Sequence, residues 1–92
     1  MHSNVVYLLH FNSPLSHARH YLGSTTNLRR RLWLHRQGRV SPLMRAVREA
    51  GITFKLARTW RFETETEARQ LEAKFKRRKN SPQLCPICRR KR

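Results

Sequence analysis

The feature that most constrains the fold is an apolar run near the N-terminus, Asn4–Phe11, which reads Asn-Val-Val-Tyr-Leu-Leu-His-Phe. Its β-branched and aromatic residues favour a strand. Because successive side chains of a strand point to opposite faces, apolar residues here fall on both faces. A chain of 92 residues has room for one modest core. The run therefore predicts a strand that is covered on both sides within a single small domain.

A second strand is expected to pair with the first. The residues Asn12-Ser13-Pro14 should end the first strand, because they favour turns and loops. Residues 20–24 can return beside it as the second strand. The two strands would then form a hairpin with a rather long loop, which would contain His17 and Arg19.

Two helices should follow the hairpin. The first would be capped by Thr26 or Asn27 and run to about Gln37. Ser41-Pro42 is a typical helix start, with serine as the N-cap and proline at the first helical position. Gly51 is suited to end this second helix. We expect two short helices after the second strand.

A third strand and a last helix complete the expected order. Residues 54–62 alternate as in a strand, and Thr64 with Glu67 forms a capping box at the start of the last helix. The order β-β-α-α-β-α indicates an α+β domain with a small three-stranded, mostly antiparallel sheet flanked by helices. This domain would span residues 1–80, and a basic tail would span residues 81–92. The apolar residues expected on one face of the third strand are Phe54, Leu56, Trp60 and Phe62.

The chain carries an extreme positive charge. There are 21 Lys and Arg residues against five Glu and no Asp, for a formal net charge of +16. Self-repulsion of this size opposes folding, so a polyanionic partner is its natural explanation, with nucleic acid first. An anionic membrane surface fits less well, because the basic residues interrupt every amphipathic segment. No apolar run reaches ~20 residues and no signal-peptide pattern is present, so we expect a cytoplasmic protein.

The two cysteines, Cys85 and Cys88, lie in a Cys-Pro-Ile-Cys motif near the C-terminus. Such a pair supplies half of the ligands of a structural zinc site. None of the histidines has zinc-finger spacing to the pair. Two interpretations are therefore open, a bound zinc ion and a reduced thiol pair that helps to pack the tail. The sequence favours the reduced thiol pair. The five histidines are His2, His10, His17, His20 and His35.

Several short motifs together resemble the GIY-YIG nuclease family. They are Val5-Val6-Tyr7, the segment Tyr21–Leu32 that begins Tyr-Leu-Gly, His35, and Leu71-Glu72 on the last helix. The resemblance covers about residues 4–80, and the expected element order is also that of the family. Val5-Val6 replaces the Gly-Ile of the family pattern. More closely, the chain is similar to the small stand-alone bacterial members that end in a Lys-Arg-Arg-Lys-Asn…Cys-Pro-x-Cys tail, some of which are specific for single-stranded DNA.

The resemblance implies a DNA endonuclease, a hydrolase of phosphodiester bonds that uses one Mg²⁺ or Mn²⁺ ion. Glu72 would bind the metal, and Arg31 would contact the scissile phosphate. Tyr7 would act as the general base, and Tyr21 would position the nucleophile. His35, one helical turn after Arg31, would share the base role or contact a phosphate.

The choice of Glu72 also rests on the residues themselves. Glu63, Glu65 and Glu67 precede the last helix or lie in its first turn, where a carboxylate is favoured by the helix dipole. Glu72 lies in the middle of that helix and has no such explanation. A carboxylate surrounded by so much positive charge should stay ionised.

A basic surface is expected to hold the DNA backbone by phosphate contacts. A non-catalytic module that binds nucleic acid through the same surface is the alternative, because composition alone does not distinguish the two. Asn80 is the candidate counterpart of an asparagine near the end of the family's core. The expected DNA-binding residues are Arg29, Arg30, Lys74, Lys76, Arg77, Arg78, Lys79 and Asn80.

Overall fold

The computed structural model describes residues 4–90, and this part of the chain forms three strands and five helices. Within residues 4–90, no helix is long and apolar enough to cross a membrane. The elements are β1 (Asn4–Leu15), β2 (Ala18–Thr25), α1 (Leu28–Arg36), α2 (Pro42–Glu49), β3 (Phe54–Phe62), α3 (Glu65–Arg78), α4 (Ser81–Leu84) and α5 (Pro86–Arg90).

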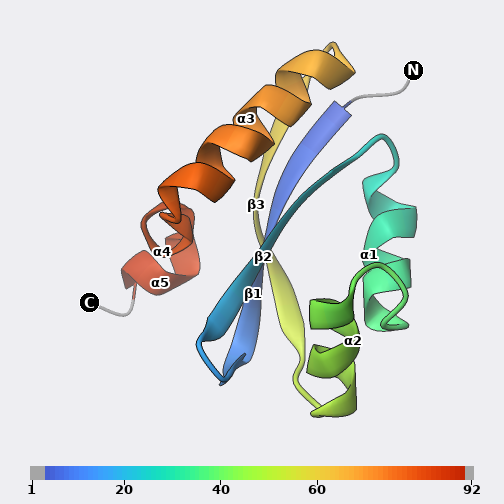
Figure 1. Cartoon of the computed structure of the whole chain (residues 1–92), viewed down its shortest axis with the longest axis vertical. Coiled ribbons are helices and arrows are strands. Elements are labelled where there is room, and N and C mark those ends of the chain that lie inside the picture. Colours follow the sequence, from blue (N-terminus) through green and yellow to red (C-terminus); the bar gives the residue numbers. More distant parts are fainter. Residues whose placement is uncertain (1–3, 91–92) are drawn as a thin grey trace.

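The sheet has β1 in its middle. Its order is β2-β1-β3, and both outer strands run antiparallel to β1. The helices α1 and α2 lie on one side of this sheet, and α3, α4 and α5 lie on the other (Figure 1). The expected α+β class, the antiparallel sheet and the element order are confirmed.

The side chains of β1 alternate between two hydrophobic clusters. Val5, Tyr7, Leu9 and Phe11 pack with Met44 and Val47 on the α1–α2 side. Val6 and Leu8 pack with Leu22, Ala68 and Cys85 on the α3 side. Full burial of a Val, Leu or Phe side chain contributes about 1.5–3 kcal/mol to the free energy of unfolding. Because the buried side chains of β1 lie on both faces, this one strand stabilises both halves of the core.

The prediction that the apolar residues of β3 share one face is wrong. The register between β1 and β3 shifts at an extra residue, Ala57, which forms a β-bulge. The bulge reverses the alternation, so Phe54 packs on the α1–α2 side, whereas Trp60 and Phe62 pack on the α3 side. Leu56 is 41% exposed. A strict period of two does not survive an inserted residue.

The hairpin between β1 and β2 is tighter than expected. β1 continues to Leu15, and β2 begins at Ala18, so only Ser16 and His17 form the turn. Ser16 has a positive φ of 55°, as a tight turn requires. Pro14 is accommodated within β1 because the pairing with β2 is irregular between residues 10 and 15.

The expected helix starts are confirmed by their capping hydrogen bonds. The side-chain oxygens of Asn27, Ser41 and Thr64 each accept a hydrogen bond from the backbone N–H three residues later. Each bond satisfies one of the N–H groups that a helix leaves unpaired at its start. These starts are decided locally, which is why the sequence predicted them.

The C-terminal residues fold back onto the sheet. Two short helices that the sequence did not indicate, α4 and α5, follow α3. Cys85 between them is fully buried and packs in the same cluster as Val6 and Leu8 of β1. Leu84, Cys85 and Ile87 of this segment therefore contribute to the core on the α3 side.

Candidate active site

The phenol of Tyr7 and the imidazole of His35 are in contact on the α1–α2 side of the sheet. Both side chains are buried, with at most 1% exposed. The Tyr7 hydroxyl and His35 Nε2 lie 2.6 Å apart and share a hydrogen bond. Tyr21 of β2 lies against the pair, with its ring centroid 4.8 Å from that of His35 and 6.2 Å from that of Tyr7. Three residues of the sequence pattern are thus in contact.

A glycine makes this arrangement sterically possible. Gly23 of β2 lies directly opposite Tyr7 of β1. A Cβ atom at Gly23 would stand 2.6 Å from the Tyr7 hydroxyl oxygen and 3.1 Å from Cε1 of Tyr21. The Tyr7 ring therefore passes over the bare backbone of β2 toward the free edge of the sheet. Gly23 belongs to the Tyr-Leu-Gly motif, but its role in the site was not predicted from the sequence.

Burial sets the protonation states of the pair. It raises the pKa of Tyr7 well above its ordinary value, and the nearby Tyr21 and Glu72 act in the same direction, while Arg31 opposes them. Burial, together with the Arg31 charge, lowers the pKa of His35 to about 4. Both groups are therefore neutral at pH 7. The other ring nitrogen of His35, Nδ1, is buried and has no hydrogen-bond partner among the described residues.

The buried, neutral His35 should make the protein sensitive to acid. Its folded-state pKa of about 4 lies below the ordinary value of 6.5, so between these pH values only the unfolded chain gains the proton. The contribution of His35 to the free energy of unfolding is fully present above pH 6.5. It should fall by roughly 3 kcal/mol as the pH drops to 4. Urea unfolding across this range should show a flatter profile for His35→Gln than for the parent.

The exposed His17 provides the matched control for this measurement. His17→Gln also removes one histidine, but from the turn between β1 and β2. Its pH profile should follow that of the parent. A parent and a His35→Gln variant with parallel profiles would contradict the assignment of this acid sensitivity to His35.

Glu72 lies on the opposite side of the sheet, on α3. Its side chain is 18% exposed, and Lys76 Nζ lies 2.8 Å from Oε2. Ser24 Oγ donates a hydrogen bond to Oε1 at 2.7 Å. Burial by itself would raise the pKa of Glu72, but the hydrogen bonds from Lys76 and Ser24 and the charges of Lys76 and Arg69 lower it overall. The carboxylate is therefore ionised at neutral pH.

The two groups of residues meet around the free edge of β2. Tyr7 and Tyr21 belong to the α1–α2 side, whereas Ser24 directs its hydroxyl to Glu72 on α3. The negative charge of Glu72 nevertheless reaches Tyr7 and contributes to its raised pKa. Arg31 of α1, which also acts on Tyr7, lines a small pocket of about 210 Å³ together with Ser24 and Arg69.

The five expected catalytic residues thus gather around one strand edge. Two neighbours of Glu72 were not predicted from the sequence: Ser24, which donates a hydrogen bond to it, and Arg69, which adds positive charge beside it. Ser24 directly follows Gly23, and its alternation to the other face of β2 was the available signal. Lys76 was expected to contact DNA, and the structure adds its ion pair with Glu72.

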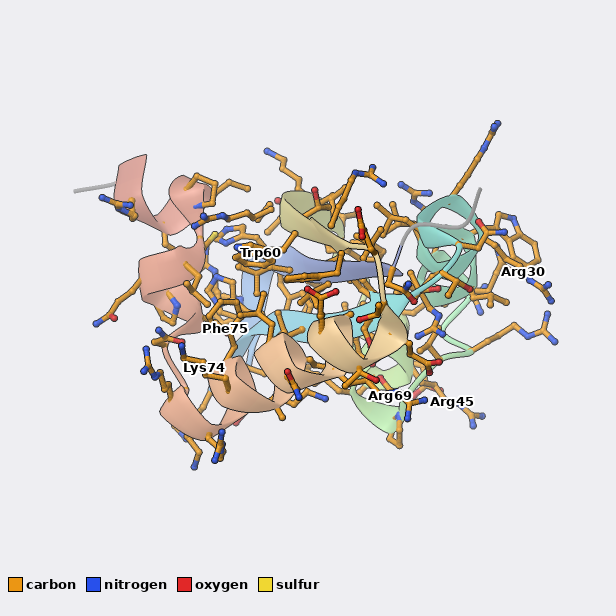
Figure 2. The ribbon with its side chains drawn as sticks, turned by 90° about the horizontal axis from the view of Figure 1, so that it is seen from above. Arg30, Arg45, Trp60, Arg69, Lys74 and Phe75 are labelled. Atoms are coloured by element: carbon orange, nitrogen blue, oxygen red, sulfur yellow. The ribbon has the colours of Figure 1, made fainter. Side chains whose placement is uncertain are left out.

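Basic side chains extend from this edge along the molecule. A second, larger pocket of about 500 Å³ is lined by Arg19, Tyr21, Lys76 and Lys79. In Figure 2, Arg30 lies at the α1 end, Lys74 lies toward the α4–α5 end, and Arg69 lies between them. Of the expected DNA-binding residues, Asn80 is half-buried, and its Oδ1 has no partner among residues 4–90. The exposed ones are Arg29, Arg30, Lys74, Lys76, Arg77, Arg78 and Lys79.

Comparison with known proteins finds a family match over most of the chain. The family model of the GIY-YIG catalytic domain matches residues 3–84. Neither the comparison with curated proteins nor the comparison with solved structures finds a match. The matched range includes every residue of the strand-edge site described above.

Proposed function

Because this chain belongs to the GIY-YIG nuclease family, we propose that it is a metal-dependent endonuclease that cuts DNA, with a preference for single strands. The observation that carries the proposal is the hydrogen bond of 2.6 Å between Tyr7 and His35. It lies at a strand edge where the charges of Arg31 and Glu72 both reach Tyr7. A merely structural tyrosine needs none of these neighbours.

The Glu72 carboxylate is suited to hold one divalent cation. It is ionised, and carboxylate oxygen is the donor that Mg²⁺ and Mn²⁺ prefer. Ser24 fixes one of its oxygens, while the other is paired with the exposed ammonium group of Lys76, which a divalent cation can displace. A single protein carboxylate suits Mg²⁺, which usually keeps several of its waters. When bound, the ion would supply positive charge to the phosphoryl oxygens.

Tyr7 and His35 would act together as the general base. The raised pKa keeps Tyr7 neutral, so it can accept a proton from the attacking water only if it gives up its own. His35 Nε2 at 2.6 Å is the available acceptor, because this ring is also neutral. The negative charge of a bound phosphodiester would favour the protonated imidazole and so promote the transfer.

Arg31 and Tyr21 would hold the substrate in place. The guanidinium of Arg31 can donate two parallel hydrogen bonds to the scissile phosphate and stabilise the charge that develops there. The Tyr21 ring packs against His35, so its hydroxyl can orient the water that attacks.

The basic pocket beside the site supports binding of single-stranded DNA. Arg19, Lys76 and Lys79 supply positive charge around Tyr21, whose ring offers a face for stacking. Trp33 of α1 is 52% exposed, and it lies on the same helix as Arg29 and Arg30. An exposed aromatic ring among arginines suits splayed bases better than a paired duplex.

A cleavage assay with labelled DNA tests the proposal directly. Single-stranded and double-stranded forms of one sequence are incubated with Mg²⁺, with Mn²⁺ or with EDTA. We expect cleavage only with metal present, and faster cleavage of the single strand. Binding without any cleavage in all three conditions would instead identify a non-catalytic nucleic-acid-binding module.

Gly23→Ala should reduce cleavage although it adds only one methyl group. The new Cβ atom cannot occupy a position 2.6 Å from the Tyr7 hydroxyl, so the phenol must move. Displacement of a catalytic group by about 1 Å can cost on the order of a hundredfold, and we expect a loss of roughly 10- to 100-fold. Single-turnover cleavage at saturating DNA measures this effect.

A double-mutant cycle shows whether Gly23 acts through Tyr7. Tyr7→Phe removes the hydroxyl, and Gly23→Ala should then cause little additional loss in that background. Equal losses in the parent and in Tyr7→Phe would mean that the added methyl group disturbs the site by another route.

A further inference from the structure

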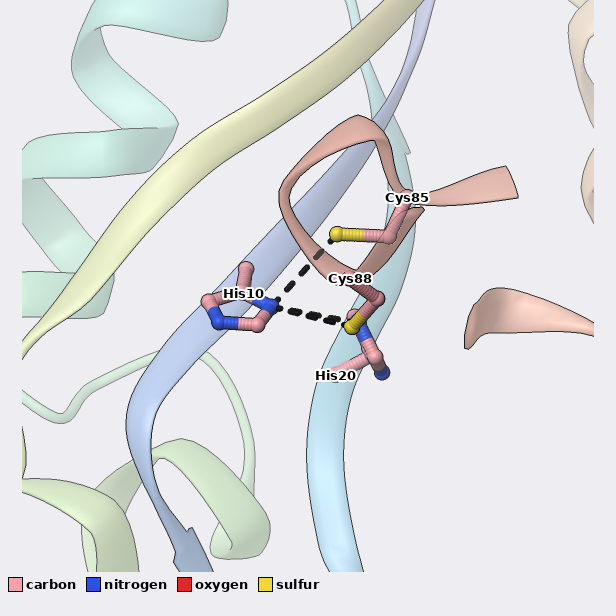
Figure 3. Close-up of side chains that lie close together, drawn as sticks. All are labelled: His10, His20, Cys85 and Cys88. Carbon is pink, nitrogen blue, oxygen red and sulfur yellow. Dashed lines mark hydrogen bonds between the residues drawn. The ribbon is translucent and has the colours of Figure 1, made fainter. Parts of the chain in front are cut away.

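Four side chains of types that can bind a metal ion converge on the α3 side of the sheet, away from the Tyr7–His35 pair. They are His10 of β1, His20 of β2, and Cys85 and Cys88 of the C-terminal segment (Figure 3). Their four donor atoms all lie within 4.8 Å of one another. Within residues 4–90 this is the one group of three or more such side chains whose donor atoms gather in this way.

The distances between the donor atoms are those of a tetrahedral zinc site. His10 Nδ1 lies 3.4 Å from His20 Nε2 and 3.4 Å from Cys85 Sγ. Cys88 Sγ lies 3.5 Å from His10 Nδ1 and 3.3 Å from His20 Nε2. With usual zinc bond lengths, tetrahedral geometry separates two nitrogens by roughly 3.3 Å and a nitrogen from a sulfur by roughly 3.6 Å. No large movement is needed to place one ion among the four atoms.

The fold explains why these residues meet. His10 and His20 are directly opposite each other in the β1–β2 register, so their side chains lie on the same face. Cys85 is fully buried against that face. Cys88 follows one helical turn later in α5, which brings its thiol back to the same point. Both cysteines are thiols, so no disulfide competes for the sulfur atoms.

A metal ion would add to the packing that holds the C-terminal segment on the sheet. The helices α4 and α5 have four and five residues, far fewer than an isolated helix needs to be stable. An ion that binds two ligands from the hairpin and two from the segment would hold them together.

We propose that His10, His20, Cys85 and Cys88 bind one structural zinc ion that clasps the C-terminal segment to the β1–β2 hairpin. Two imidazoles and two thiolates complete a four-coordinate site with no open position, which is the pattern of structural rather than catalytic zinc. The soft sulfur donors distinguish it from the oxygen site at Glu72, which suits Mg²⁺. Zinc was disfavoured from the sequence because none of the histidines has zinc-finger spacing to the two cysteines. That argument does not hold in the folded chain, because the hairpin register and the folded-back segment bring the four side chains together.

The zinc site would also shape the DNA surface. His20 lines the 500 Å³ pocket together with Lys76, Lys79, Ser81 and Pro82. The clasp therefore fixes the end of α3 and the start of α4 beside Tyr21. Loss of zinc should loosen this end of the pocket, while Tyr7 and His35 remain on the other face.

Metal analysis of the full chain tests the proposal. The protein is purified under reducing conditions without chelator and without added metal, and its zinc content is measured by mass spectrometry. We expect one zinc per chain. Cobalt in place of zinc should produce the spectrum of a tetrahedral Co²⁺ ion with thiolate ligands. A chain without zinc that also binds neither added Zn²⁺ nor added Co²⁺ would overturn the proposal, as would a Cys85–Cys88 disulfide in the reduced preparation.

Variants separate this site from the cleavage site. Cys88→Ser and His20→Asn should lose the zinc, whereas the matched control His17→Gln and the site variant Glu72→Ala should each keep one zinc per chain. Zinc retained in both Cys88→Ser and His20→Asn would contradict the ligand assignment.

The parent protein provides a measurement that does not depend on whether variants fold. The parent chain is first stripped of metal with a chelator and a thiol reagent, and is then reduced. Its Tm should rise by about 10 °C or more when Zn²⁺ is added. Mg²⁺ should produce no such gain. An equal gain with both ions, or with neither, would contradict a thiolate-ligated zinc site.

Discussion

Replacing Glu72 with alanine should abolish DNA cleavage while DNA binding survives. The variant removes the carboxylate proposed to hold the divalent cation, whose charge stabilisation is worth several kcal/mol in phosphoryl transfer. We therefore expect a loss of at least about 1000-fold in single-turnover cleavage. Binding should be unchanged or tighter, because the change removes a negative charge and releases Lys76 from its ion pair.

Two further variants make this result specific. Glu72→Gln keeps an oxygen for Ser24 Oγ, so it should be inactive for lack of charge without loss of that hydrogen bond. Glu49→Ala removes an exposed carboxylate that pairs with Arg45 on α2, and its cleavage rate should match that of the parent. If Glu72→Ala cuts as fast as the parent with Mg²⁺ present, the metal ligand has been assigned wrongly.

Arg31→Ala should have the second-largest effect. The guanidinium acts on Tyr7 and lines the pocket shared with Ser24, so a phosphate bound there would lie beside both. Loss of one donor to the developing negative charge costs on the order of 100- to 1000-fold in turnover. The loss should appear at saturating DNA, where binding is no longer limiting.

Arg30→Ala is the matched control, because it removes an exposed arginine from the same helix. The Asn27 cap is kept, since it uses the backbone N–H of Arg30. This variant should weaken DNA binding and lower the slope of binding against salt by about one, with turnover preserved. Equal losses of turnover in the two variants would mean that Arg31 serves as one more phosphate contact.

The secondary structure was largely predictable because its signals are local. The cap residues Asn27, Ser41 and Thr64 act on N–H groups three residues away, and a sequence shows them directly. The bulge at Ala57 was not predictable, because it is a property of the pairing between β3 and β1. The helices α4 and α5 were missed for the same reason, since their stability comes from packing against the sheet.

The site was only partly predictable. Tyr21, Gly23, Arg31 and His35 lie within 15 residues of chain, so their motif could be recognised and their relative positions expected. Glu72 depended on elimination among five glutamates. Its partner Ser24 lies 48 residues away, and only the packing of α3 across β2 brings the two side chains within 2.7 Å.

By itself, the sequence predicted the order of the first six elements, the strand covered on both faces and the helix caps, and its net charge indicated a polyanionic partner. Periodicity, capping and net charge are properties of neighbouring residues or of the whole composition. Only the tertiary structure decided the reversal within β3, the burial that keeps Tyr7 and His35 neutral, and the meeting of His10 and His20 with two cysteines. Cys85 lies 75 residues from His10, and no spacing rule spans such a distance. Their donor atoms meet because strand register and chain reversal, rather than sequence separation, determine which side chains share a face.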